Sequence, residues 1–172
     1  MSRPWSWLFL SRPVSLFSNC LPANHCGTVP GSTEQEVLAI GTPAIWWASV
    51  AALLFCLGWW LARRDWRAGA VLLAVAAGWL PWVWFYVHDQ RTEFYFYAIA
   101  FLPYLVIAIT LCLGLILGPP GAVRSRRVLG GAVVGVYLLL VLANFAYLYP
   151  VLAAQAIPYG AWYQRMWLHG WI

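Results

Sequence analysis

The sequence predicts an all-α membrane protein with four transmembrane helices. Of its 172 residues, 63% are hydrophobic, whereas water-soluble domains usually contain about 45–50% apolar residues. A transmembrane helix needs about 20 mainly apolar residues. Four stretches satisfy this requirement and contain no Asp, Glu, Lys or Arg: approximately residues 39–62, 68–87, 94–118 and 128–149. The strands of a membrane barrel would be shorter and would alternate apolar with polar residues.

Two further segments flank the predicted four-helix region, which covers residues 39–149. Residues 1–38 precede it, and an aromatic tail, residues 150–172, follows it. The beginning of the chain lacks the continuous apolar region of about 7–15 residues that a secretory signal contains. We expect both flanking segments to be extracytoplasmic, because of the orientation that the arginines predict.

The arginines predict the orientation of the helices. All ten basic residues are Arg, and six of them lie in the two turns that connect the first span to the second and the third span to the fourth. They are Arg63, Arg64, Arg67, Arg124, Arg126 and Arg127. Because positive charge is enriched in cytoplasmic loops, we expect both termini and the loop 88–93 to be extracytoplasmic. The arginines form no basic stripe along the chain, so the net charge of +5 does not indicate that the protein binds nucleic acid.

The loop 88–93 is the main candidate for a binding site. Its Arg91 carries a planar, permanent charge that suits a phosphate, and Phe94–Tyr97 follows with four aromatic rings. Such rings can stack against a sugar or guide a polyprenyl chain. The alternative is an Arg that snorkels to the interface beside an ordinary aromatic belt. Asp89 and Glu93 also have the spacing of an acid pair on a helix, but this spacing alone is a weak signal and a solvated turn is the favoured explanation.

We predict a disulfide bond between Cys20 and Cys26, because they lie in a loop-like segment that we place on the oxidising side of the membrane. A metal site with His25 is the rival, but these three residues lack a fourth ligand. Within the spans, Asn144 is expected to hydrogen-bond a neighbouring helix, and Gly131 and Gly135 offer a small surface for close approach. No nucleophile motif or metal-ligand cluster is evident, so we predict no catalytic residue, metal or cofactor in this chain.

Several motifs, in this order, resemble one family. They are Trp5-Ser6-Trp7, Arg12-Pro13-Val14-Ser15, Ala39-Ile-Gly-Thr-Pro-Ala-Ile-Trp-Trp, Arg63-Arg64-Asp65-Trp66-Arg67-Ala68, Arg91-Thr92-Glu93-Phe94-Tyr95-Phe96-Tyr97, Ala143-Asn144-Phe145-Ala146-Tyr147-Leu148-Tyr149-Pro150, Ile157-Pro158-Tyr159 and Arg165-Met166-Trp167. The chain is similar over nearly its whole length to the C-terminal four-helix region of bacterial, particularly actinobacterial, protein O-mannosyltransferases.

The resemblance implies part of a membrane-embedded, inverting glycosyltransferase of the GT-C type. Such enzymes transfer mannose from polyprenyl-phosphate-mannose to Ser or Thr hydroxyls of exported proteins, at the extracytoplasmic face of the cell membrane. A positively charged site holds the lipid phosphate while an acid deprotonates the acceptor hydroxyl. Carried onto this sequence, Arg91 becomes the contact to the donor phosphate with Tyr95 and Tyr97 nearby, and His88 and Asp89 line the acceptor side.

Departures from the family pattern set the expected role of the chain. The catalytic acidic pair of the family lies in the first outer loop of a much longer protein, and nothing here matches it. We therefore expect a C-terminal piece that is inactive alone and partners a missing N-terminal catalytic half. Leu16, Phe17 and Glu93 also differ from the usual pattern. The alternative is a free-standing four-helix scaffold or partner subunit without catalysis.

Overall fold

The computed structural model describes residues 2–22, 27–89 and 92–172. Its four long apolar helices are α1 (Pro43–Arg63), α2 (Trp66–His88), α3 (Leu102–Leu117) and α4 (Arg124–Leu152). In the described part of the chain, α1, α2 and α4 are long and apolar enough to cross a membrane, whereas α3 is shorter, at 16 residues. The predicted mostly helical, multi-pass membrane architecture is confirmed.

The ends of α1 and α2 follow from local sequence. Pro43 occupies the first turn of α1, where its missing N–H removes no helical hydrogen bond. Arg64 ends α1 in the left-handed region, at φ 51°. The Asp65 side chain then accepts a hydrogen bond from the Arg67 backbone N–H at 2.9 Å and caps α2. This cap starts α2 at Trp66, two residues before the predicted start of the span.

The third predicted span, residues 94–118, is divided in the structure. A 3-10 helix, η2 (Tyr95–Ala100), is followed at Phe101 by α3. Phe101 is fully buried, and Pro103 lies in the first turn of α3. Because Pro cannot donate a backbone hydrogen bond and clashes with the preceding turn, it starts α3 here rather than continuing a helix from Phe94.

A small antiparallel sheet, which we did not predict, lies beside the helices. Its strands β1 (Val14–Leu21), β2 (Thr33–Ala39) and β3 (Ile157–Pro158) pair in the order β1-β2-β3. Strand β2 buries alternate side chains, as a strand with one covered face should. Two of those buried side chains are Glu34 and Glu36. Because they are acidic, a hydrophobicity pattern of period two does not reveal the strand.

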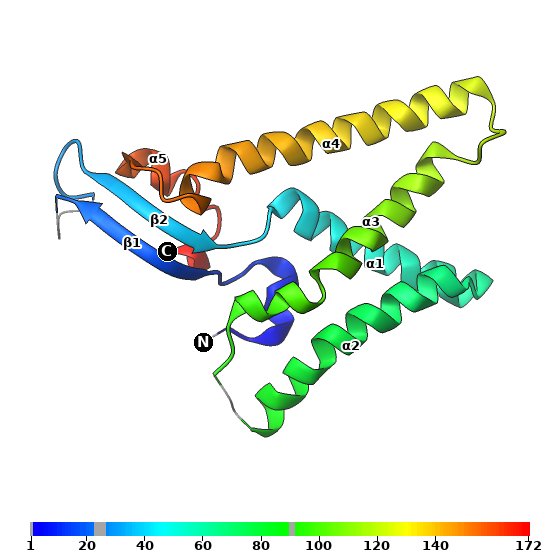
Figure 1. Cartoon of the computed structure of the whole chain (residues 1–172), viewed down its shortest axis with the longest axis horizontal. Coiled ribbons are helices and arrows are strands. Elements are labelled where there is room, and N and C mark those ends of the chain that lie inside the picture. The colour runs from blue at the N-terminus through cyan, green and yellow to red at the C-terminus, as the bar shows by residue number, and fades with distance from the viewer. Residues whose placement is uncertain (1, 23–26, 90–91) are drawn as a thin grey trace.

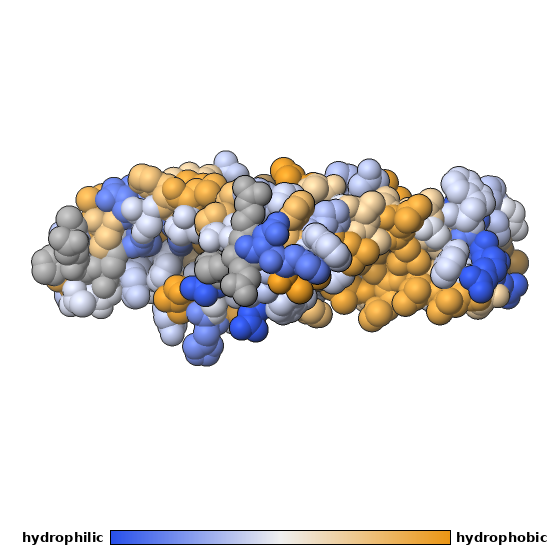
Figure 2. Space-filling model, turned by 90° about the horizontal axis from the view of Figure 1, so that it is seen from below, coloured by the Kyte–Doolittle hydropathy of each residue, from blue (hydrophilic) through white to orange (hydrophobic). Residues whose placement is uncertain are grey.

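The sheet and both ends of the described chain lie at one end of the molecule, and the two arginine-rich turns lie at the other (Figure 1). Hydrophobic residues cover much of the helical region in the view from below, with hydrophilic residues at its far end (Figure 2). Two short C-terminal helices, α5 (Tyr159–Tyr163) and η3 (His169–Trp171), complete the sheet end.

The main core joins the N-terminal segment to the helices. The 3-10 helix η1 (Pro4–Phe9) contributes Trp7, which is 1% exposed. The Trp46 indole N–H donates to the Trp7 carbonyl at 2.7 Å, and the Trp79 indole N–H donates to the Pro4 carbonyl at 2.9 Å. Residues that precede the first span are therefore anchored on α1 and α2 by indole hydrogen bonds.

Two glycines, Gly78 and Gly130, allow close packing of the helices. A Cβ on Gly78 would lie 2.9 Å from the Phe101 Cβ, so α2 approaches the start of α3 closely here. A Cβ on Gly130 would lie 2.5 Å from the Ile116 carbonyl oxygen. Gly131 and Gly135, which we expected to offer the small surface, face open space. The helical phase puts Gly130, not its neighbours, against α3 within the described chain.

Candidate functional site

Two residues of the predicted acceptor side lie at the sheet end of α2. His88 is the last residue of the helix and Asp89 follows as its C-cap. The His88 ring stacks on Trp84 with 3.7 Å between ring centroids, and its Nδ1 lies 3.1 Å from the Trp84 carbonyl oxygen. Both side chains are exposed. The structure therefore brings an imidazole and a carboxylate to an open surface beside the loop.

Arg91, the predicted contact to the donor phosphate, lies outside the described residues. Its role stays a prediction. Cys26 also lies outside them, whereas Cys20 takes part in a disulfide bond. Cys56 and Cys112 are free thiols within the helices.

Tyr95 points into the core and is 5% exposed. Its hydroxyl oxygen accepts a hydrogen bond from the Gly41 backbone N–H at 3.0 Å, and its ring lies 5.5 Å from that of Trp46. The hydroxyl holds the connection between β2 and α1 in place. In this geometry the Tyr95 hydroxyl is directed into the protein rather than presented at the surface.

Tyr97 lies in a cluster of rings contributed by three segments. It stacks on Trp82 with 4.4 Å between centroids and 7° between planes, and its centroid is 6.4 Å from that of Trp7. The cluster joins η1, α2 and η2. We call this cluster of Trp7, Trp82 and Tyr97 the aromatic wall.

The acid pair considered for Asp89 and Glu93 does not share a helical surface, because α2 ends at His88. Glu93 is 2% exposed. Its carbonyl oxygen accepts hydrogen bonds from the Ser2 backbone N–H at 3.2 Å and from the Ser2 hydroxyl at 3.3 Å. The Trp7 indole N–H donates to the same hydroxyl. Glu93 thus belongs to the junction between the loop and the N-terminal segment.

Sequence reasoning missed a second acidic cluster, Glu34 and Glu36 on β2. Both residues are 5% exposed. The Ser18 hydroxyl donates to Glu34 Oε1 at 2.7 Å, and the Trp162 indole N–H donates to Glu36 Oε2 at 2.6 Å. The available signal was that Glu34 and Glu36 are two residues apart in a segment bounded by turn-forming residues. In a strand, this spacing puts both carboxylates on one face. Within the described residues, no group of three or more His, Cys, Asp or Glu side chains is placed to hold a metal.

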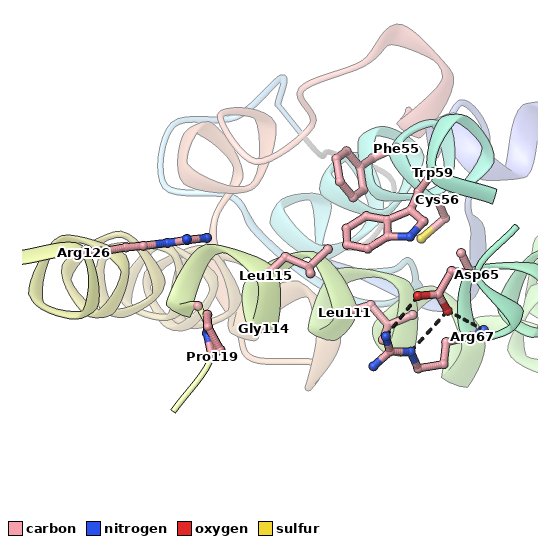
Figure 3. A pocket seen from close by; sticks show the side chains of 12 residues that line it. Phe55, Cys56, Trp59, Asp65, Arg67, Leu111, Gly114, Leu115, Pro119 and Arg126 are labelled. Atoms are coloured by element: carbon pink, nitrogen blue, oxygen red, sulfur yellow. Dashed lines mark hydrogen bonds and ion pairs between the residues drawn. The ribbon is translucent and has the colours of Figure 1, made fainter. Parts of the chain in front are cut away.

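The opposite end of the molecule contains a cavity of about 410 Å³ between α1, α3 and the first turn of α4 (Figure 3). Phe55 and Trp59 of α1 and Leu111 and Leu115 of α3 form much of its lining. Arg67 and Arg126 also line it, together with Asp65. The cavity therefore combines apolar walls with cationic groups.

One ion pair at this end has a defined electrostatic consequence. Arg67 Nη2 lies 3.0 Å from Asp65 Oδ2, and Arg67 Nε donates to Asp65 Oδ1 at 3.2 Å. The pKa of the Asp65 carboxyl is held below its ordinary value, first by the side-chain hydrogen bond from Arg67 and then by the backbone N–H of that residue. Asp65 thus stays ionised, caps α2 and neutralises Arg67.

Comparison with known proteins decides the family. Residues 1–171 match the model of the C-terminal four-TMM region of protein-O-mannosyltransferase. The chain belongs to this family.

Relatives from three species are similar in sequence to almost the whole chain. A Mycobacterium tuberculosis polyprenol-phosphate-mannose–protein mannosyltransferase is 41% identical over 171 residues, which is 99% of this chain and 32% of the relative. The protein of the same description from Mycolicibacterium smegmatis is 39% identical over 170 residues, with the same two coverages, and that from Corynebacterium glutamicum is 32% identical. The chain therefore spans about a third of the length of these curated relatives.

A solved structure supports the fold. The Saccharomyces cerevisiae protein O-mannosyltransferase Pmt1–Pmt2 complex bound to the sugar donor contains a chain that matches with a TM-score of 0.71 at 20% identity. The match covers 99% of this chain and 23% of that one. The overall fold of this chain is therefore shared with part of that chain.

Proposed function

We propose that this chain forms the C-terminal membrane region of an enzyme that transfers mannose from polyprenyl-phosphate-mannose to Ser or Thr hydroxyls of exported proteins. The observation that carries this proposal is the 41% identity, over 99% of the chain, to a protein named for that donor and reaction class. The described residues supply binding surfaces and helix packing, and the catalytic base comes from the rest of the enzyme.

The proposed orientation places the sheet end on the extracytoplasmic side of the cell membrane. Six arginines occupy the two turns at the opposite end (Figure 1). Positive charge of this kind marks the cytoplasmic side. His88 and Asp89 then face the compartment in which an exported acceptor protein would arrive.

In this proposal Arg91 binds the donor phosphate. A guanidinium binds a phosphate through two parallel hydrogen bonds, and the loop that contains Arg91 leads into the aromatic wall formed by Trp7, Trp82 and Tyr97. The stacked rings of Trp82 and Tyr97 hold the chain after the loop in one position. A fixed chain position after the loop limits the entropy lost when the donor binds. His88 and Asp89 contribute to the acceptor side.

A chimeric enzyme tests these roles. In it, this chain replaces the corresponding C-terminal third of the M. smegmatis relative, in membranes that lack the host enzyme. Mannose transfer from polyprenyl-phosphate-mannose to an acceptor peptide is then measured for the parent chimera, Arg91→Ala, and the matched surface control Arg12→Ala. Loss of a charge-assisted hydrogen bond should lower kcat/KM for the donor by roughly ten- to a hundredfold in Arg91→Ala.

The controls separate the possible outcomes. Arg12→Ala should match the parent, and Arg91→Lys should recover part of the donor affinity because it keeps the charge but not the paired geometry. An Arg91→Ala chimera with unchanged donor KM and turnover would exclude the phosphate role. A folded parent chimera without any transfer would instead favour the scaffold alternative.

A further inference from the structure

The cavity at the arginine-rich end has the shape and polarity of a site for an amphipathic molecule. Its walls are aromatic and aliphatic: Phe55 and Trp59 lie edge to face with 5.5 Å between centroids, and Leu111 and Leu115 lie opposite on α3 (Figure 3). Apolar walls of this kind gain stability when an apolar group replaces water. A soluble anion alone would leave them uncovered.

The charge at the rim comes from Arg126. The other lining arginine, Arg67, is neutralised by its ion pair with Asp65. Among the residues that the structure describes, Arg126 forms no ion pair. Its side chain crosses Gly118, where an added Cβ would lie 3.1 Å from Arg126 Nε. Gly118 therefore lets the guanidinium reach the mouth of the cavity.

The surroundings strengthen this positive potential. The two turns at this end contain six arginines, and Asp65 is their one acidic residue. A basic pocket between membrane helices on the cytoplasmic side suits the phosphate of an anionic lipid. A zwitterionic lipid would also fill the apolar walls, but its cationic headgroup would offset the attraction of its phosphate to Arg126 and the neighbouring arginines.

We propose that the cavity binds one anionic diacyl phospholipid, with an acyl chain against Phe55, Trp59 and Leu115 and the phosphate at Arg126. This site lies at the opposite end of the helices from the loop 88–93, and it does not depend on the proposed mannosyl transfer. The lipid fills the space between α1 and α3 and neutralises part of the positive charge at the turns.

Native mass spectrometry of the 172-residue chain in detergent tests the site. The chain is titrated with phosphatidylglycerol, and in parallel with phosphatidylcholine that has the same acyl chains. Phosphatidylglycerol should bind more tightly. Arg126→Gln should weaken its binding roughly fivefold, as expected for one charge near an anionic headgroup. The matched control Arg124→Gln changes an exposed arginine of the same helix that does not line the cavity, and it should have a smaller effect.

A cavity-filling variant tests the apolar part independently. Gly114 lines the cavity, and a Cβ added there meets nothing within 4 Å, so Gly114→Leu has room to fold. It should reduce binding of phosphatidylglycerol, whereas Gly131→Leu, whose Cβ also meets open space, should not. Circular dichroism spectra that match the parent show that both variants are folded.

Other results would overturn the proposal. Equal binding of the two lipids, with no effect of Arg126→Gln, would show that charge does not select the ligand. Inorganic phosphate that displaces phosphatidylglycerol completely would assign the site to a free anion. Loss of lipid binding in the chimera with the longer relative would show that other protein segments occupy the cavity.

Discussion

Trp82 of α2 and Tyr97 of η2 stack face to face, with 4.4 Å between ring centroids and 7° between ring planes. This pair connects the two elements on either side of the loop 88–93. The family resemblance implies that Tyr97 lies near the donor phosphate, and the structure shows that its ring belongs to the aromatic wall. Experiments can distinguish whether Tyr97 contacts the donor or only packs against its neighbouring rings.

Tyr97→Ala should destabilise the folded chain by at least the roughly 0.5–1.5 kcal/mol that an aromatic pair contributes beyond its buried area. Tyr97→Phe keeps the ring and should retain nearly all of the stability. Denaturant titrations in mixed micelles, followed by circular dichroism, measure both. Stability alone does not test contact with the donor. If the hydroxyl contacts the donor, Tyr97→Phe in the chimera would raise the donor KM although stability is unchanged.

Tyr95→Phe should lower the free energy of unfolding by about 1–3 kcal/mol, because it leaves the backbone N–H of Gly41 without its acceptor. The same titration measures the loss. Tyr104→Phe is the control, since its side chain is 38% exposed and should tolerate the change. A stability equal to that of the parent would refute the structural role of the Tyr95 hydroxyl.

Asn144→Leu should also destabilise the chain by about 1–3 kcal/mol, because a backbone donor in the first turn of α1 loses its partner. In the structure, the Ala44 N–H donates to Asn144 Oδ1 at 3.0 Å, which confirms the predicted bond to a neighbouring helix. Asn144→Asp keeps an acceptor oxygen and should lose less. Equal losses for the two variants would show that packing, not this hydrogen bond, dominates at the position.

Stability should fall in acid partly through Asp65. The pKa of its carboxyl is depressed in the folded chain below the ordinary value of 3.8 by the hydrogen bonds from Arg67. A depressed pKa contributes stability above the ordinary value, and this contribution is lost as pH falls through the folded value. Asp65→Asn should therefore be less stable than the parent at neutral pH, and the difference should shrink below pH 3.8.

Unfolding titrations from neutral to acidic pH measure that difference. Asp89→Asn is the matched control, since Asp89 follows α2 rather than capping its start. A gap between the parent and Asp65→Asn that stays constant across the range would contradict the role of the ionised carboxylate.

The helices could be predicted because their cause is local. Uninterrupted apolar stretches of sufficient length require membrane spans, and the arginine clusters marked the two turns that now lie at one end of the molecule. The Asp65 cap was also readable in principle, since Asp before a helical run is a common N-cap. The prediction of the third span, residues 94–118, was less accurate, because the effect of Pro103 depends on where Phe101 becomes buried.

The sheet and the candidate site depended on tertiary contacts. Residues 33–39 alternate between covered and open positions, but the covered side chains include Glu34 and Glu36. Their hydrogen bonds come from Ser18 and Trp162, and Trp162 is 126 residues away from Glu36. Composition cannot show that a carboxylate will find such a partner. For the same reason, the sequence did not show that Tyr95 bonds to Gly41 or that Tyr97 stacks on Trp82.

The amino-acid sequence alone determined the membrane class, the helices and the place of the loop 88–93 between two spans. Tertiary structure decided what surrounds that loop. His88 and Asp89 lie exposed at the end of α2, whereas Tyr95 turns inward to Gly41 and Tyr97 stacks on Trp82. The physical reason is that hydrophobicity acts residue by residue along the chain, while stacking and hydrogen bonding depend on partners that only folding brings together.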